Sequence, residues 1–174
     1  MDARNETELA RMKSRMTVER KSERELVISR TFNAPARLVF EAWSTPELFK
    51  QWWVPKSMPM SLRACEMDIR TGGKYRLVFG DETTVFMEVF GKYLEVTPPL
   101  RIVWTNEEAD EGGAVTTVTF EEKAGETVLV IHELYPSKKA LEDALASGST
   151  EGYPEQLEQL QEFLTTRVAN LGRA

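Results

Sequence analysis

Residues 67–104 read MDIRTGGKYRLVFGDETTVFMEVFGKYLEVTPPLRIVW, and this stretch decides the fold. It contains apolar runs rich in β-branched and aromatic residues, which are typical of β-strands. Compact turns separate the runs, at Thr71-Gly72-Gly73, Gly80-Asp81-Glu82 and Thr97-Pro98-Pro99. Glycine supplies the positive φ that tight hairpin turns require. The stretch therefore predicts consecutive antiparallel strands joined by short links.

Further strands and two short helices are predicted outside this stretch. Strand-like runs cover residues 25–32, 60–68, 115–121 and 127–134, which brings the total to about six or seven strands. Prolines follow the first of these runs, and proline suits the first position of a helix because its missing N–H costs nothing there. We therefore expect two short helices, starting near Pro35 and near Pro46, directly after the first strand.

A long amphipathic helix is predicted at the C-terminal end. Its apolar residues recur every three or four positions, which places them on one helical face. They are Tyr153, Leu157, Leu160, Leu164, Val168 and Leu171. The order of elements predicts an α+β fold, in which a curved antiparallel sheet surrounds this helix and leaves a cavity between the two.

Composition narrows the class of protein. The chain has 174 residues, which suits one domain, and a net charge of −6, which argues against nucleic acid or an anionic membrane as a partner. One cysteine, Cys65, and one histidine, His132, exclude an internal disulfide and a Cys/His zinc cluster. No apolar run reaches the roughly 18 residues of a membrane-spanning helix. We expect a cytoplasmic protein with no metal and no cofactor.

The N-terminal residues differ in composition from the rest. Thirteen of the first 25 residues are charged. We therefore divide the chain into a charged arm, residues 1–23, and a domain, residues 24–171. Leu9, Met12 and Met16 would form a thin apolar stripe on a helix. The arm is either solvated and frayed, or a helix that docks on the domain or on a second subunit.

Four segments carry a resemblance to a known family. They are FNAPARLVFEAWSTPELFKQWW (32–53), MDIRTGGKYR (67–76), FGKYLEVTPPLRIVWT (90–105), and VIHELYPSKKALE (130–142) followed by GYPEQLEQLQEFL (152–164). In this order they resemble the family named after the activator of the heat-shock-protein-90 ATPase. That family is a branch of the START-like, birch-pollen-allergen-like (SRPBCC) superfamily. The resemblance covers about residues 24–166.

The resemblance implies a helix-grip fold with a deep pocket between the sheet and the C-terminal helix. Members of the superfamily bind lipids, polyketides, hormones and other apolar molecules, and a few are polyketide aromatases or cyclases. The family's eukaryotic name-giver stimulates a chaperone ATPase. Family membership does not determine function, because one fold carries many activities.

Three functions follow as hypotheses. The leading one is a binding domain for a small apolar or amphipathic ligand. The second is a polyketide cyclase- or dehydratase-like enzyme that uses His132, Tyr75 or Arg76 as acid, base or electrostatic stabiliser. The third is a protein-interaction module, either chaperone-linked or a homodimer. No nucleotide loop, nucleophile elbow or paired metal-ligand motif is present, so no catalytic residue is assigned.

The candidate ligand-binding residues are large apolar side chains on the predicted elements. Alternation puts Tyr75, Leu77 and Phe79 on one strand face, which we expect to point inward. The strand that contains Phe86 is apolar on both faces, so alternation does not orient it. Adjacent tryptophans on a helix cannot point the same way, so one should be core and the other at the cavity mouth. The full set is Trp52, Trp53, Tyr75, Leu77, Phe79, Phe86, Tyr93, Trp104, Phe120, His132, Tyr153, Leu157 and Leu160. The alternative is that they fill a solid interior and that His132 is a hydrogen-bonded core residue.

Overall fold

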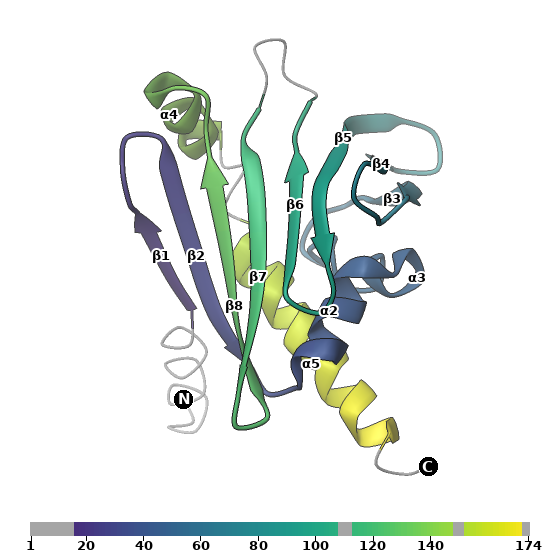
Figure 1. Ribbon diagram of the computed structural model, residues 1–174. Coiled ribbons are helices and arrows are strands. Elements are labelled where there is room, and N and C mark those ends of the chain that lie inside the picture. The colour runs from purple at the N-terminus through teal and green to yellow at the C-terminus, as the bar shows by residue number, and fades with distance from the viewer. Residues whose placement is uncertain (1–15, 108–112, 148–151, 172–174) are drawn as a thin grey trace, which may run out of the picture.

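An eight-stranded antiparallel sheet forms the framework of the computed structural model, which describes residues 16–107, 113–147 and 152–171 (Figure 1). The strands lie in the order β1-β2-β8-β7-β6-β5-β4-β3. Their bounds are Met16–Arg20 (β1), Glu25–Phe32 (β2), Ser61–Met67 (β3), Lys74–Gly80 (β4), Val85–Thr97 (β5), Arg101–Thr105 (β6), Val115–Lys123 (β7) and Glu126–Leu134 (β8).

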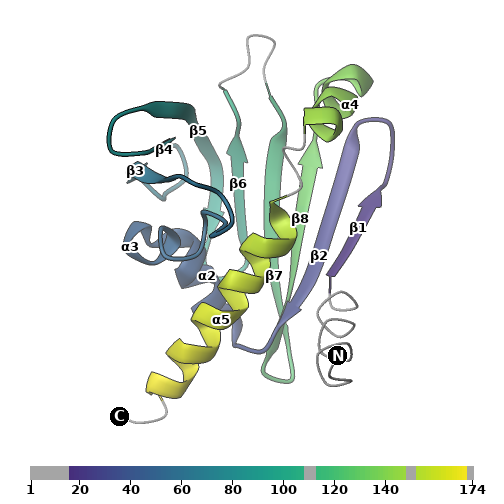
Figure 2. The ribbon, with the colours of Figure 1, turned by 180° about the vertical axis from the view of Figure 1, so that it is seen from behind.

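Helices cover one face of the sheet. Figure 2 shows α5 crossing that face, with α2 and α3 beside it and α4 at one end of β8. The bounds are Ala36–Ser44 (α2), Pro46–Phe49 (α3), Lys138–Ser147 (α4) and Tyr153–Leu171 (α5). None of these four helices combines the length and apolar character that crossing a membrane requires. The predicted α+β helix-grip arrangement, with two short helices after a strand and a long C-terminal helix, is confirmed.

The predicted number of strands was too low. The additional strand is β1, which lies within the segment that we assigned to the charged arm and pairs antiparallel with β2 at the edge of the sheet. Of its five residues only Met16 is partly buried, so the strand carries no pattern of core residues that the sequence could reveal. Leu9 and Met12 of the predicted arm lie outside the described residues.

The long strand β5 bends the sheet. Its first part pairs with β4 up to Lys92, and its last part, from Tyr93 onward, pairs with β6. Gly91 lies where the pairing changes, and a Cβ atom there would approach the Thr105 carbonyl oxygen to 2.0 Å. Only glycine allows the two backbones to come this close. The bend brings β3 and β4 toward the face that the helices cover, where β3 contacts α3.

The core lies between the helices α2 and α5 and the half of the sheet formed by β2, β7 and β8. Leu157, Leu160 and Leu164 of α5 are fully buried, as the helical spacing predicted. On β8, Leu129 and Ile131 point toward the helix and are also fully buried. Each such side chain stabilises the fold by about 1.5–3 kcal/mol relative to an exposed one.

Candidate functional site

A cavity of about 940 Å³ lies between the curved sheet and the N-terminal part of α5. Its walls come from β3, β4, β5, β6 and the end of β8, from α2, α3 and α4, and from the loop between α3 and β3. No residue of β2 or β7 lines it, although the described residues include both strands completely. The size lies within the range of about 300–1,000 Å³ that is usual for small-molecule sites.

Most of the wall is apolar and adaptable. Four methionines, Met58, Met60, Met67 and Met87, line it together with aromatic rings. Methionine is unbranched and polarizable, so a wall rich in methionine can adapt to ligands of different shape. Trp53 contributes a rigid ring, because it stacks on Phe49 with 4.7 Å between the ring centroids.

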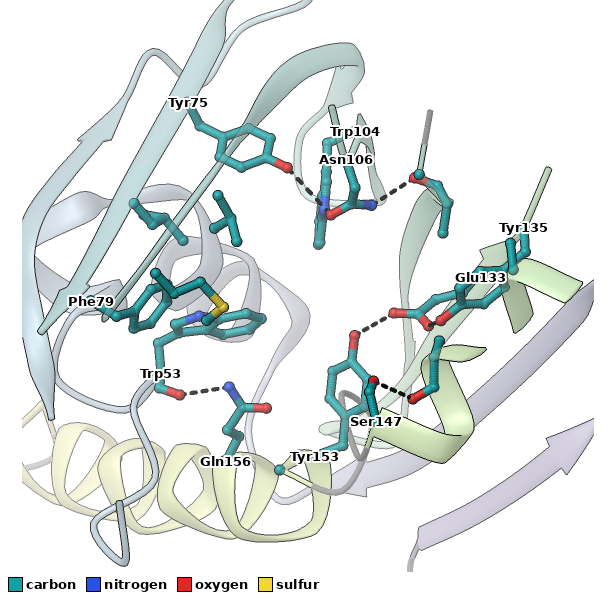
Figure 3. A pocket seen from close by; sticks show the side chains of 18 of the residues that line it. Trp53, Tyr75, Phe79, Trp104, Asn106, Glu133, Tyr135, Ser147, Tyr153 and Gln156 are labelled. Carbon is teal, nitrogen blue, oxygen red and sulfur yellow. Dashed lines mark hydrogen bonds between the residues drawn. The ribbon is translucent and has the colours of Figure 1, made fainter. Parts of the chain in front are cut away.

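The buried carboxylate of Glu133 is the main polar feature of the cavity. Glu133 is 8% exposed and accepts a hydrogen bond on each oxygen: from the Tyr153 hydroxyl at 2.6 Å and from the Tyr135 hydroxyl at 2.7 Å. Figure 3 shows this group on the opposite side of the cavity from Trp53 and Phe79. Alternation along β8 positions Glu133, because it shares the inward face with Leu129 and Ile131.

Charge and burial keep the two tyrosines neutral. Burial raises the pKa of Tyr135 and of Tyr153 well above that of a free phenol, and the neighbouring Glu133 charge raises both further. Both phenols therefore act as donors near neutral pH. Among the described residues, no lysine, arginine or histidine forms an ion pair with Glu133.

A second polar group, around Asn106, is satisfied by the protein itself. The Asn106 amide donates to the Ala114 carbonyl at 2.7 Å and to the Thr116 hydroxyl at 3.1 Å. The Tyr75 hydroxyl donates to the Thr105 carbonyl at 2.6 Å and lies 3.4 Å from the Asn106 side-chain oxygen (Figure 3). These bonds join β4, β6 and the start of β7, so we assign this group a structural role.

Side chains of α5 hold the loop between α3 and β3, which forms part of the cavity wall. Gln159 donates to the backbone carbonyls of Trp52 and Val54, both at 2.9 Å, and accepts from the Lys56 N–H at 2.8 Å. Gln156 donates to the Trp53 carbonyl at 2.6 Å. The loop that carries Trp53 is thus attached to the helix by its main chain.

The predicted ligand-binding residues divide into two sets. Seven line the cavity: Trp53, Tyr75, Leu77, Phe79, Tyr93, Trp104 and Tyr153. The expectation that Tyr75, Leu77 and Phe79 point inward is confirmed. The other six do not line it: Trp52, Phe86, Phe120, His132, Leu157 and Leu160.

Those six lie elsewhere for three reasons. Trp52, Phe120, Leu157 and Leu160 are fully buried in the core, and the Trp52 indole N–H donates to the Ala42 carbonyl at 3.1 Å. Phe86 is 51% exposed, because β5 turns its other face, with Met87 and Val89, toward the cavity. His132 occupies the outward face of β8.

The outward histidine weakens the predicted enzyme. The Nε2 atom of His132 lies 2.7 Å from a carboxylate oxygen of Glu25, a residue of the neighbouring strand β2. Arg76 also points outward, where it pairs with Glu88 at 2.7 Å. Of the three proposed acid–base or stabilising residues, only Tyr75 lines the cavity.

The sequence analysis missed Glu133 and Tyr135. The available signal was that Glu133 is in phase with Leu129 and Ile131, and that Tyr135 follows two positions later. A carboxylate in phase with core residues indicates a buried polar group, but only the fold shows that this face of β8 points inward. The described residues contain no group of three His, Cys, Asp or Glu side chains that could hold a metal ion.

Comparisons with known proteins agree with this architecture. Residues 33–165 match the family model described as "Activator of Hsp90 ATPase homolog 1-like protein". A solved structure from Nitrosomonas europaea is 27% identical with a TM-score of 0.75, and the alignment covers 86% of this chain and 99% of that one. A protein from Rhodobacter sphaeroides is 20% identical with a TM-score of 0.78, over 87% and 98% of the two chains. An AHSA1-like protein from Aeromonas hydrophila is 17% identical with a TM-score of 0.62, over 81% and 93%. No curated protein sequence matches the chain.

Proposed function

Since the chain belongs to the family of Activator of Hsp90 ATPase homolog 1-like proteins, we propose that it binds a small, largely apolar molecule in the cavity between its sheet and α5. The observation that carries this proposal is the cavity itself, about 940 Å³ in volume and lined mainly by methionine and aromatic side chains. Binding would be driven by transfer of apolar ligand surface out of water, which is worth about 25 cal/mol per Å².

The arrangement of the wall supports binding rather than simple packing. Leu157, Leu160 and Leu164 of α5 already have a solid core to pack against, formed with β2 and β8. The cavity lies on the other side, over β4 to β6, where Leu77 and Phe79 are buried in the wall without filling the space. A largely apolar space of this size is expected to admit a ligand, because clefts of this volume lined by apolar and aromatic side chains are the usual small-molecule sites.

Ligand screening by native mass spectrometry and thermal shift tests the proposal. The library should contain fatty acids, aromatic amines and alcohols, and polycyclic aromatics. We expect binding of one-to-one stoichiometry and a higher melting temperature for the classes that fit. Leu77→Trp should weaken binding by narrowing the cavity, because Leu77 lines it.

Leu94→Trp is the matched control. Leu94 lies on β5, is 51% exposed and does not line the cavity, so the same added volume should leave binding unchanged. If no member of the library binds, or if the Leu77→Trp and Leu94→Trp variants bind equally well, the cavity is not a ligand site.

A further inference from the structure

We infer that the preferred ligand carries a protonated amine on an apolar body, with the ammonium group against Glu133. This inference rests on the proposed function and names the chemical class that the cavity would select. The main contacts are the two Glu133 oxygens, which lie in the wall and are held by Tyr135 and Tyr153.

The carboxylate has unused capacity for hydrogen bonds. An ionised carboxylate can accept about four, and the two tyrosine hydroxyls supply one to each oxygen of Glu133. These donors fix the orientation of the carboxylate but bring no positive charge. In the part of the chain that the structure describes, Glu133 has no cationic partner within 4.0 Å.

A ligand cation would supply the positive charge that Glu133 lacks. Bringing two charges together inside a protein is usually offset by the cost of removing both from water. At this site Glu133 is already buried in the folded protein, because the residue is 8% exposed. The burial of Glu133 lowers the part of the desolvation cost that falls on the protein, and a hydrogen bond between charged groups is stronger than one between neutral groups. A carboxylate ligand would instead be repelled.

The other charges at the cavity act differently. Asp143 and Lys139 of α4 also line it, but they pair with each other at 3.1 Å, and both are largely exposed. Water screens exposed charges strongly. The selective interaction is therefore assigned to Glu133 and not to the rim.

Three probes of one shape test the inference by isothermal titration calorimetry at neutral pH: naphthylethylamine, naphthylethanol and naphthylacetate. They share an aromatic body and differ in a cationic, neutral or anionic end. We expect the amine to bind at least about tenfold more tightly than the alcohol, and the acid most weakly. In Glu133→Gln, which keeps the shape and removes the charge, the amine should lose this advantage.

Asp143→Asn is the matched control, since it removes the same charge from the cavity rim and should preserve the preference for the amine. The inference is overturned if the alcohol or acid binds wild-type protein as tightly as the amine, or if Glu133→Gln keeps the preference. Binding of the alcohol without the amine would overturn the inference alone, whereas failure of all three probes and of the wider library would also overturn the proposed function. If Glu133→Gln does not fold, the wild-type ranking of the three probes still decides.

Discussion

Two adjacent tryptophans have different surroundings and should have different effects when removed. Trp52 is fully buried and its indole donates to the Ala42 carbonyl, so Trp52→Ala should lower the free energy of unfolding by about 3–5 kcal/mol. Trp53 is half-buried in the cavity wall, so Trp53→Ala should cost about 1–2 kcal/mol and mainly weaken ligand binding. Urea denaturation and ligand titration measure the two effects. Equal losses of stability would contradict this assignment.

Buried phenols make the fold sensitive to alkaline pH. Burial raises the pKa of Tyr93, Tyr135 and Tyr153 above the value of about 10 that an unfolded chain shows. A raised pKa in the folded state means that the full stabilisation is present below pH about 10 and is lost as the pH rises through the folded pKa values. The urea midpoint should therefore fall steeply above pH about 10. Tyrosinate absorbance should appear together with unfolding, and Tyr153→Phe should make the decline shallower.

One result of the alkaline titration would contradict this prediction. If all tyrosines ionise near the pH of free phenol while the urea midpoint stays constant, they are solvated in the folded protein. The hydrogen bonds from Tyr135 and Tyr153 to Glu133 would then not be maintained in solution.

His132 and Glu133 show what the alternation of side chains along a strand can predict and what it cannot. It correctly places the two side chains on opposite faces of β8. It does not show which face points toward α5, because Val128 and Val130 on one face are as apolar as Leu129 and Ile131 on the other. The choice depends on which face of the sheet α5 covers, and that is a tertiary property.

At the scale of elements, α5 holds part of the cavity wall in place as well as contributing to the core. Gln159 is 8% exposed and makes three hydrogen bonds to the loop main chain between Trp52 and Lys56. Gln159→Ala would leave these backbone groups without partners, which costs about 1–3 kcal/mol for a buried group. We expect a loss of about 2 kcal/mol in the free energy of unfolding. Amide hydrogen exchange should also accelerate across the loop.

Glu162→Ala on the same helix serves as the control. Glu162 is exposed, so its truncation should change stability by less than about 0.5 kcal/mol and leave exchange in the loop unchanged. Equal exchange rates in the Gln159→Ala and Glu162→Ala variants would show that the loop does not depend on Gln159.

Elements with a clear periodicity of apolar residues could be predicted from the sequence, and elements without such a periodicity could not. The leucines of α5 recur at helical spacing and are fully buried, so that helix was predicted from Tyr153 to Leu171. The edge strand β1 is mostly exposed and charged, and it exists because Met16–Arg20 pairs with β2. Phe86 lies on the solvent side of β5 because it alternates with Met87 and Val89, which face the cavity, and the sequence does not indicate which of these two apolar faces points inward.

At the scale of the whole molecule, the cavity exists because the two halves of the sheet differ: one half is packed into the core and the other lines an open space. The α5 leucines are buried against the half formed by β2, β7 and β8, whereas the inward side chains of β3 to β6 line the cavity. Glu133 lies at the boundary, on the last inward position of β8 before α4. The cavity thus lies over β3 to β6, whereas β2, β7 and β8 carry a solid core.

A buried ion pair attaches the helix to the solid half of the sheet. Arg30 of β2 is 3% exposed, and its guanidinium lies 2.8 Å from the Glu158 carboxylate on α5, which is 25% exposed. Removing either partner leaves the other charge alone, and the cost depends on how buried that charge is. Glu158→Ala leaves a buried guanidinium and should cost about 3 kcal/mol. Arg30→Met leaves a partly solvated carboxylate and should cost less.

The double variant Arg30→Met/Glu158→Leu distinguishes a true pair from two independent contacts. Because it leaves no unpaired charge and adds apolar contact, its free energy of unfolding should lie close to that of the wild type. Arg167 and Glu41, also 2.8 Å apart but more exposed, provide the matched pair, whose removal should cost at most about 1 kcal/mol. Additive losses in the Arg30/Glu158 double-mutant cycle, measured by urea denaturation, would mean that the helix is held to the sheet by its leucines alone.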